Sequence, residues 1–245
     1  TMLVASTSYQ PEREEEQIRT LVARGADALL LIGHARAPEI YAFLEAQGVP
    51  SLVTWAYDPS APRPSVGFDN AAAMALMARA VLSEGHRRLG LITASTISND
   101  RAQERQAGIK SAMQDAGLDP ASLDVVETTY SIENGAAAFS TLMARSRPPT
   151  AVFCGNDVLA VGALRQAQEM QIKVPDAVSV VGFDDIELAQ VAYPPLTTIH
   201  VPHREMGRRA AQTLVQMLND GQNATSVALV PDLVVRSTLG PVPRS

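Results

Sequence analysis

The chain has 245 residues, 46% of them hydrophobic, which is enough to bury the core of one large domain or of two ordinary ones. Its formal net charge of −6 leaves no excess of positive charge to neutralise phosphates, so this chain alone is not expected to bind DNA. Cys154 is its single cysteine, which excludes an internal disulfide framework and a zinc site built from thiolates.

Short apolar runs alternate with amphipathic stretches along the whole chain. A strand is expected at residues 2–5. A helix follows, with Pro11 in its first turn and Gly25 at its end, and then a strand at 28–32 that is apolar on both faces. The same pattern repeats with helices at about 38–48, 70–85, 101–117, from 133 and from 157, and with strands at 49–54, 88–93, 124–128, 151–154 and 178–183.

This alternation predicts an α/β fold with parallel sheets that helices cover on both faces. Roughly ten elements of each kind are too many for one sheet of ordinary width, so we expect two doubly wound lobes. Ligands of such sheets bind outside the carboxyl ends of the strands, and a cleft between two lobes would collect several strand ends.

Several segments resemble, in the same order, the effector-binding domain of the lactose/galactose repressor family (LacI/GalR). They are VGFDN (66–70), SEGHRRLGLI (83–92), RAQERQAGIKSAMQDAGL (101–118) and the run from AVFCGNDVLA to RRAAQTL (151–214). The first of these, with SYQPEREEEQI (8–18), is most similar to gluconate-operon repressors. The resemblance implies two lobes of the type I periplasmic-binding-protein-like fold: residues 1–96 with 202–222, and residues 97–201 with 223–240.

The resemblance also implies a function: the effector-sensing and dimerisation domain of a cytoplasmic bacterial transcriptional repressor. A small sugar or sugar acid is expected in the cleft between the lobes, where it modulates operator binding by a homodimer. DNA would be reached only through an N-terminal helix-turn-helix that this sequence does not contain, and no cofactor, metal or membrane is expected. The alternative is an exported sugar-binding protein of a transporter, but PPLTTIHVPHREMGRRAA (194–211) resembles the repressors in particular.

The family's sensing domain begins with a strand and a helix that precede the position of Met2, and this sequence lacks both. In the expected strand order the first strand lies inside the sheet, so its loss would leave an unpaired gap. We therefore expect this sequence to be part of a longer polypeptide and to lack part of the pocket.

Polar residues that follow predicted strands are the first candidates for effector contacts. Asp184 follows the strand at 178–183 and matches the family's ligand-contacting aspartate, whereas Asp185 is expected to cap the next helix. Either Asn156 or Asp157 must cap the helix that starts there, and the resemblance favours Asn156 for the ligand. Carboxylates and amides of this kind can satisfy sugar hydroxyls, often two at a time.

Two arginines on one predicted helix are further candidates. Arg105, in RQAG, matches the family's effector-contacting arginine, although an exposed helix arginine is the alternative. Arg101 lies four residues earlier on the same helix face, and the two together would suit a carboxylate-bearing ligand. Tyr130 matches the family's aromatic stacking residue, and Asn70 matches a polar contact but could equally cap a helix.

Two positions depart from the family. An aspartate is usual where Trp55 stands, so packing is expected for this side chain, and a glutamine is common where Val201 stands, so that contact is expected to be lost or replaced. The chain is not expected to be an enzyme, because it has no G-x-S-x-G, Walker or H-E-x-x-H motif and its four histidines are scattered.

The helix at 70–85 is the candidate surface for subunit pairing. Ala71, Met74, Ala75 and Ala78 give it an apolar face. An obligate dimer pairs through large apolar surfaces, so this face is expected to contact a second subunit.

Overall fold

The computed structural model describes residues 1–7, 10–221 and 224–243. The chain forms two compact units, one made of Thr1–Asp69, Ile97–Arg101 and Pro202–Leu229, the other of Asn70–Thr96, Ala102–Val201 and Val230–Ser245. Each unit has its own parallel sheet, so the predicted α/β class with two parallel sheets is confirmed. Among the described residues, no helix combines the length and the apolar character that crossing a membrane requires.

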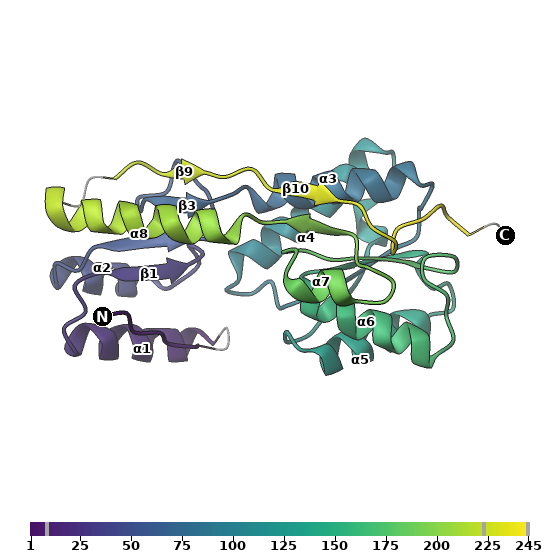
Figure 1. Ribbon diagram of the computed structural model, residues 1–245, viewed down its shortest axis with the longest axis horizontal. Coiled ribbons are helices and arrows are strands. Elements are labelled where there is room, and N and C mark those ends of the chain that lie inside the picture. Colours follow the sequence, from purple (N-terminus) through teal and green to yellow (C-terminus); the bar gives the residue numbers. More distant parts are fainter. Residues whose placement is uncertain (8–9, 222–223, 244–245) are drawn as a thin grey trace. The chain divides into compact units, whose positions relative to one another are not determined.

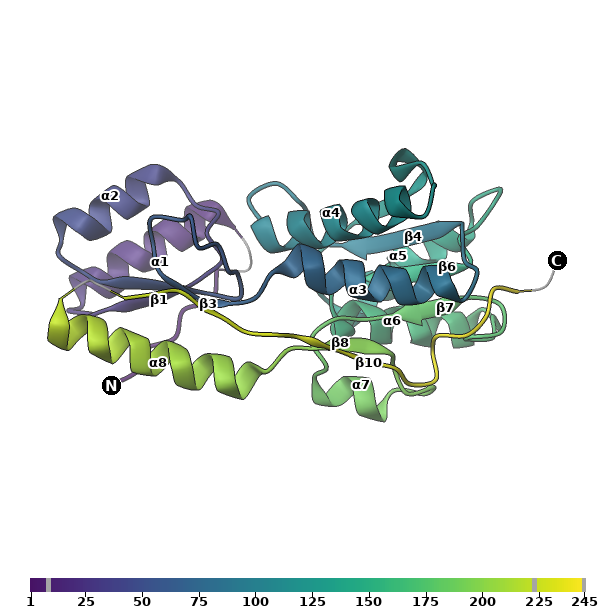
Figure 2. The same cartoon turned by 90° about the horizontal axis from the view of Figure 1, so that it is seen from above.

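The first unit is built on a sheet of strand order β1-β2-β3-β9, in which every neighbouring pair is parallel. Helices α1 and α2 pack on one face of this sheet through Ile18 and Leu44, and α8 lies on the other face (Figure 2). The elements are α1 (Pro11–Ala23), β1 (Leu29–Ile32), α2 (Pro38–Ala46), β2 (Ser51–Thr54), β3 (Ser65–Gly67), α8 (His203–Asp220) and β9 (Val227–Ala228).

The strand predicted at residues 2–5 does not form. Met2 and Val4 are 85% and 83% exposed, and these residues belong to no sheet. β1 is the edge strand instead, and its alternate residues Leu30 and Ile32 are about half exposed. An extended run becomes a strand only when a neighbour accepts its hydrogen bonds, and apolar character alone does not supply that neighbour.

The second unit is built on a sheet of strand order β5-β4-β6-β7, again parallel throughout. Helices α5 and α6 lie on one side of it and α3 and α4 on the other (Figure 1), while β8 and β10 form a separate antiparallel pair. The elements are α3 (Asn70–Ser83), β4 (Leu89–Thr93), α4 (Asp100–Asp115), a 3-10 turn η1 (Pro120–Ser122), β5 (Asp124–Glu127), α5 (Ile132–Met143), β6 (Ala151–Cys154), α6 (Asp157–Glu169), β7 (Ser179–Val181), α7 (Glu187–Val191), β8 (Thr198–His200) and β10 (Asp232–Val234).

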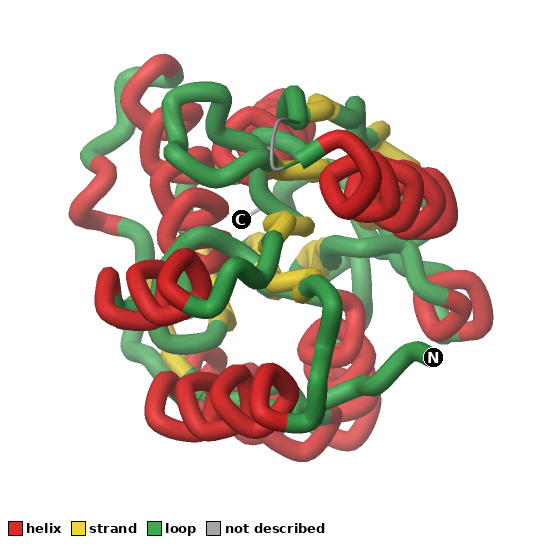
Figure 3. The backbone as a smooth tube through the Cα atoms, turned by 90° about the vertical axis from the view of Figure 1, so that its left-hand side faces the viewer, coloured by secondary structure: helices red, strands yellow, loops and turns green. Residues whose placement is uncertain are grey.

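Helices α5 and α6 pack backbone to backbone. A Cβ added at Gly162 would lie 2.1 Å from the carbonyl oxygen of Ile132, and one added at Gly135 would lie 2.3 Å from that of Leu159. The close approach puts Phe139 and Leu164 into one core cluster against the sheet. Helices surround the strands in the tube drawing of the backbone (Figure 3).

The two units differ from the expected lobes at residues 70–96, 97–101 and 223–229. β4 hydrogen-bonds with β5 and β6, so residues 70–96 belong to the second unit and not to the first. β9 pairs with β3, which keeps the chain up to Leu229 in the first unit. The chain therefore first passes between the units at Asp69, about one helix and one strand earlier than expected.

The face of α3 that was expected to pair with a second subunit is part of the core, so that prediction is wrong. Met74 and Ala78 are fully buried and Ala75 is 8% exposed. The carbonyl oxygen of Ala71 faces Gly108 of α4, where a Cβ would lie only 2.2 Å away. A helix that covers a parallel sheet buries its apolar stripe within its own domain, and the sequence pattern of such a stripe is the same as that of an interface.

Candidate functional site

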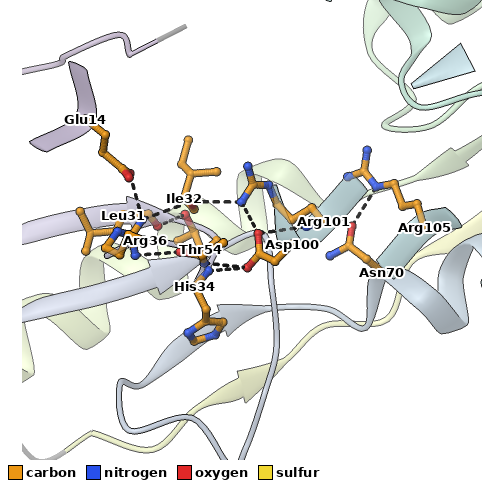
Figure 4. Close-up of polar contacts among 12 residues, drawn as sticks. Glu14, Leu31, Ile32, His34, Arg36, Thr54, Asn70, Asp100, Arg101 and Arg105 are labelled. Carbon is orange, nitrogen blue, oxygen red and sulfur yellow. Dashed lines mark hydrogen bonds and ion pairs between the residues drawn. The ribbon is translucent and has the colours of Figure 1, made fainter. Parts of the chain in front are cut away.

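Arg105 lies in the middle of a polar cluster in the second unit. Its Nε donates to Oδ1 of Asn70 at 2.9 Å and its Nη1 donates to the carbonyl oxygen of Gly155 at 2.6 Å. Figure 4 shows the guanidinium and the Asn70 amide pointing toward each other. The guanidinium carbon also lies 3.8 Å from the centre of the Phe183 ring, a cation–π contact. Arg105 is therefore a buried cation that hydrogen bonds fix in place, and the alternative of an exposed helix arginine is wrong.

Asp184 supplies the opposite charge. Its Oδ1 lies 3.9 Å from Nη2 of Arg105, and its side chain is mostly buried. Burial raises the pKa of this carboxyl to about 6, and the charge of Arg105 acts in the opposite direction. The structure thus brings together Asp184, Arg105 and Asn70, three of the residues predicted for the site, as an acceptor and donors that could bind hydroxyl groups.

The backbone at Asp184 and Asp185 has an unusual conformation, with φ values of 110° and 57°. Asp185 does not cap helix α7, contrary to the prediction; the N-cap of that helix is Ile186, which makes no side-chain cap bond. The Asp185 carboxylate accepts instead from Arg236 at 2.7 Å and contacts Nδ1 of His200 at 3.0 Å. These charged partners from distant parts of the chain take the place of a local helix cap.

Helix α6 begins with two polar residues that have different hydrogen-bond partners. Asn156 is the N-cap, and its Oδ1 accepts from the backbone N–H of Leu159 at 3.0 Å. Asp157 is fully buried and accepts from Thr198 at 2.6 Å and from the backbone N–H of Ile186 at 2.9 Å. Burial raises the pKa of Asp157 to about 7, against the effect of these two hydrogen bonds. Asn156 is thus the helix cap, and its contact with an effector stays a prediction.

Two further positions considered in the sequence, Tyr130 and Val201, also lie in this unit. Tyr130 is partly buried and packs against the core cluster formed by α5 and α6. Val201 is fully buried and donates its backbone N–H to the carbonyl oxygen of Asp184 at 3.3 Å. Its backbone thus stays in contact with Asp184, although its side chain offers no polar group. The stacking role of Tyr130 stays a prediction.

Arg101 belongs to the first unit, where its partner is the neighbouring Asp100. Its Nη1 lies 2.8 Å from Oδ1 of Asp100 and donates to the carbonyl oxygen of Ile32 at 3.1 Å (Figure 4). The guanidinium lies over Gly33, where a Cβ would be 1.6 Å from Nη1, and φ at this glycine is 72°. The two arginines of α4 therefore have separate partners. Sequence reasoning missed Asp100, whose signal was an acid at the start of a predicted helix.

Trp55 also belongs to the first unit. Its ring contacts Phe68 edge-on, with 6.4 Å between the ring centres, and lies 5.1 Å from the His203 ring at the start of α8. This agrees with the expectation that Trp55 packs. Within the described parts of the chain, His, Cys, Asp and Glu side chains do not gather in groups of three that could hold a metal.

Comparison with known proteins identifies the family. The model of the periplasmic binding protein-like domain matches residues 78–239. The chain is 32% identical over 243 residues to the ribose operon repressor of Haemophilus influenzae, covering 97% of this chain and 71% of the relative. It is 31% identical to the transcriptional repressor CytR of Escherichia coli K12, covering 99% and 71%. The chain belongs to the LacI family of transcriptional regulators.

Solved structures agree with this assignment. A LacI-family regulator from Silicibacter pomeroyi is 30% identical with a TM-score of 0.85 and covers 97% of this chain and 87% of its own. The regulator GntR from Chromobacterium violaceum is 28% identical with a TM-score of 0.89 and covers 98% and 88%. The predicted resemblance and the type I periplasmic-binding-protein-like fold of this LacI-family domain are thereby confirmed.

The relatives also decide the general function. They are transcriptional repressors, so this LacI-family domain is the effector-binding part of such a repressor, and the prediction that it is not an enzyme is confirmed.

Proposed function

We propose that this domain senses a small neutral sugar and that Asp184 and Arg105 bind it. The observation that carries the proposal is the buried pair of opposite charges beside the Asn70 amide. A carboxylate accepts hydrogen bonds from two neighbouring hydroxyls, while a guanidinium donates to hydroxyl oxygens, and both bonds are charge-assisted. Binding in the repressor would modulate operator affinity through the ligand's different affinity for two conformations.

The balance of charges favours a neutral sugar over a sugar acid. Arg105 faces Asp184, and Arg101 is paired with Asp100, so each arginine already has a carboxylate. A ligand carboxylate that approached either of these arginines would therefore also meet a carboxylate of the protein. Two relatives support the same class of ligand: the Haemophilus influenzae protein is a ribose operon repressor, and a LacI-family regulator from Enterococcus faecium was solved with bound ribose. The second is 25% identical with a TM-score of 0.84 and covers 93% of this chain and 84% of its own.

Removing the acceptor tests the sugar proposal. Titration calorimetry with D-ribose, D-glucose and D-gluconate is expected to find its highest affinity for a neutral sugar. Asp184→Ala should weaken that binding by about 2 kcal/mol, roughly 30-fold, because charge-assisted hydrogen bonds to hydroxyls are lost. Asp115→Ala, which removes an exposed acid at the end of α4, should bind as the parent does. Equal affinity of the parent and Asp184→Ala for the best sugar contradicts the site, and highest affinity for gluconate contradicts the neutral class.

The second part of the proposal concerns partners. We place the repressor in the cytoplasm as a homodimer that reaches operator DNA through a helix-turn-helix outside this sequence.

With the face of α3 buried, a surface of the second unit is the better candidate for pairing. Val191 and Tyr193 are 76% and 86% exposed and lie close together in the sequence, beside the apolar part of a groove. Tyr193 lines this groove of about 460 Å³, and Val191 lies two residues before it at the end of α7. The groove has an apolar part (Leu164, Ala167, Ile172, Val174, Pro194 and Pro195) and a polar part (Gln168, Lys173, Asp176 and Ser237).

A dimer with two-fold symmetry would bury this surface, because the exposed side chain of Tyr193 and the groove lie in the same patch. In a symmetric dimer, Tyr193 of each copy can enter the groove of the other, so the contact is made twice. Sedimentation equilibrium of the chain at micromolar concentration is expected to show a dimer, and Tyr193→Glu to show a monomer. A monomeric parent, or a Tyr193→Glu variant that still dimerises, would contradict pairing through this surface.

A further inference from the structure

The segment that carries Asp184 is held in a conformation that its residues do not prefer. Asp184 and Asp185 both have positive φ, at 110° and 57°. For residues with a Cβ, each such conformation costs about 1–3 kcal/mol and persists only where surrounding contacts fix it. The contacts that fix this segment therefore also decide where the Asp184 carboxylate points.

Asp157 holds the segment from the side of helix α6. Its backbone N–H donates to the carbonyl oxygen of Phe183 at 2.9 Å, and its Oδ2 accepts from the N–H of Ile186 at 2.9 Å, so it brackets Asp184 on both sides. Its Oδ1 accepts from Thr198 of β8 at 2.6 Å. A Cβ at Gly182 would lie 2.3 Å from that oxygen, so only glycine permits this approach.

Asp185 and Arg236 hold the segment from the side of β8 and β10. Nη2 of Arg236 donates to Oδ1 of Asp185 at 2.7 Å, and Nη1 donates to the carbonyl oxygen of Leu196 at 2.8 Å. The backbone N–H of Arg236 donates to Oγ1 of Thr197 at 2.9 Å. Arg236 follows β10, which pairs with β8, so one side chain ties two neighbouring segments to the turn at Asp184 and Asp185.

We propose that Asp157, Asp185 and Arg236 are positioning residues that hold Asp184 in its left-handed conformation and so aim its carboxylate at Arg105. None of the three needs to touch the effector. The backbone of Asp184 itself is fixed by its N–H, which donates to the carbonyl oxygen of Ile199 at 2.9 Å. The inference rests on the proposed role of Asp184 in effector binding.

Replacing Asp185 by glycine separates the effect of losing the Asp185 side-chain bonds from the effect of backbone strain. Because glycine adopts positive φ without cost, Asp185→Gly removes the bonds to Arg236 and His200 and leaves the turn allowed. Asp185→Asn keeps an acceptor and also tolerates positive φ. In calorimetry with D-ribose as the probe, Asp185→Gly is expected to lose about tenfold in affinity, because the Asp184 carboxylate is then less preorganised for the ligand, and Asp185→Asn to recover most of it.

Amide hydrogen exchange measured by NMR gives a second readout that needs no ligand. In Asp185→Gly and Arg236→Gln the amides of Asp184 and Val201 are expected to exchange faster, because the bonds of the turn to the chain at Ile199–Val201 open. The amide of Val180 in β7 donates to the carbonyl oxygen of Thr238, away from the turn, and should exchange as in the parent. Unchanged exchange at Asp184 and Val201 in both variants contradicts the proposal.

A core variant controls for general destabilisation. Leu142 is fully buried in the core cluster of the same unit, so Leu142→Ala lowers stability without touching the turn. If Leu142→Ala weakens D-ribose binding as much as Asp185→Gly does, the positioning role is wrong. If Asp184→Ala itself binds D-ribose like the parent, the proposed function is wrong. The exchange rates then still show whether Asp185 and Arg236 hold the turn at Asp184.

Discussion

Arg105→Met is expected to destabilise the domain by about 3 kcal/mol and to abolish effector binding. The guanidinium is the cation facing Asp184, and it also bonds with Asn70 and with the carbonyl oxygen of Gly155. Methionine replaces most of the stem volume but supplies no charge or donor. Removing one partner of a buried pair leaves the other charge uncompensated, and this costs about 3–5 kcal/mol in comparable cases.

The pH dependence of this loss identifies its cause. Arg105 lowers the pKa of Asp184, so the pKa, already raised to about 6, should rise further in Arg105→Met. A carboxyl whose folded pKa lies above its unfolded value costs stability as pH rises from the unfolded pKa through the folded one. Urea unfolding should therefore show a smaller deficit at pH 5 than at pH 8, and Asp184→Asn in the same background should recover part of it. A deficit that is equal at both pH values, with no recovery, would contradict the assignment.

Gly162→Ala is expected to destabilise the domain by about 3 kcal/mol, although alanine in a helix is intrinsically favoured over glycine by about 1 kcal/mol. The new Cβ would lie 2.1 Å from the carbonyl oxygen of Ile132 and 2.9 Å from the backbone nitrogen of Ala136. These are backbone atoms of α5 that cannot rotate away, so the two helices must separate and the core between them must loosen.

Gly207→Ala is the matched control. Gly207 lies on the exposed side of α8, where an added Cβ would meet nothing within 4 Å. This substitution gains helix preference without a clash and should stabilise by up to about 1 kcal/mol. Urea unfolding of the two variants should give shifts of opposite sign. Stabilisation by both would show that α5 and α6 do not pack as closely as described.

The elements could be predicted because their signals are local. Pro11 at the first turn of α1 and Gly25 just past its end mark that helix without reference to the rest of the chain. The run at 2–5 failed for the opposite reason, since a strand depends on a neighbour that local sequence does not identify. The apolar stripe at Met74 and Ala78 was assigned to an interface because burial inside the chain and burial between chains leave the same pattern.

The site was only partly predictable. The resemblance to a family pointed to Asp184 and Arg105, and the structure brings them together. The role of Asp185 was missed because its partner Arg236 is 51 residues away in the sequence. Asp157 was considered only as a helix cap, yet its carboxylate bonds with Ile186, 29 residues away. Local rules such as capping cannot compete with tertiary partners that only the fold reveals.

Each unit is assembled from three separated stretches of chain, and both are completed late. During synthesis the first unit lacks α8 and β9 until residue 229 has been translated, and the second lacks Arg236 until still later. Nascent chains are therefore expected to expose apolar surface on both units until the C-terminal stretch emerges. A premature stop codon between residues 202 and 229 would for the same reason leave both units incomplete, whereas one between residues 230 and 236 would spare the first unit and remove Arg236 from the second.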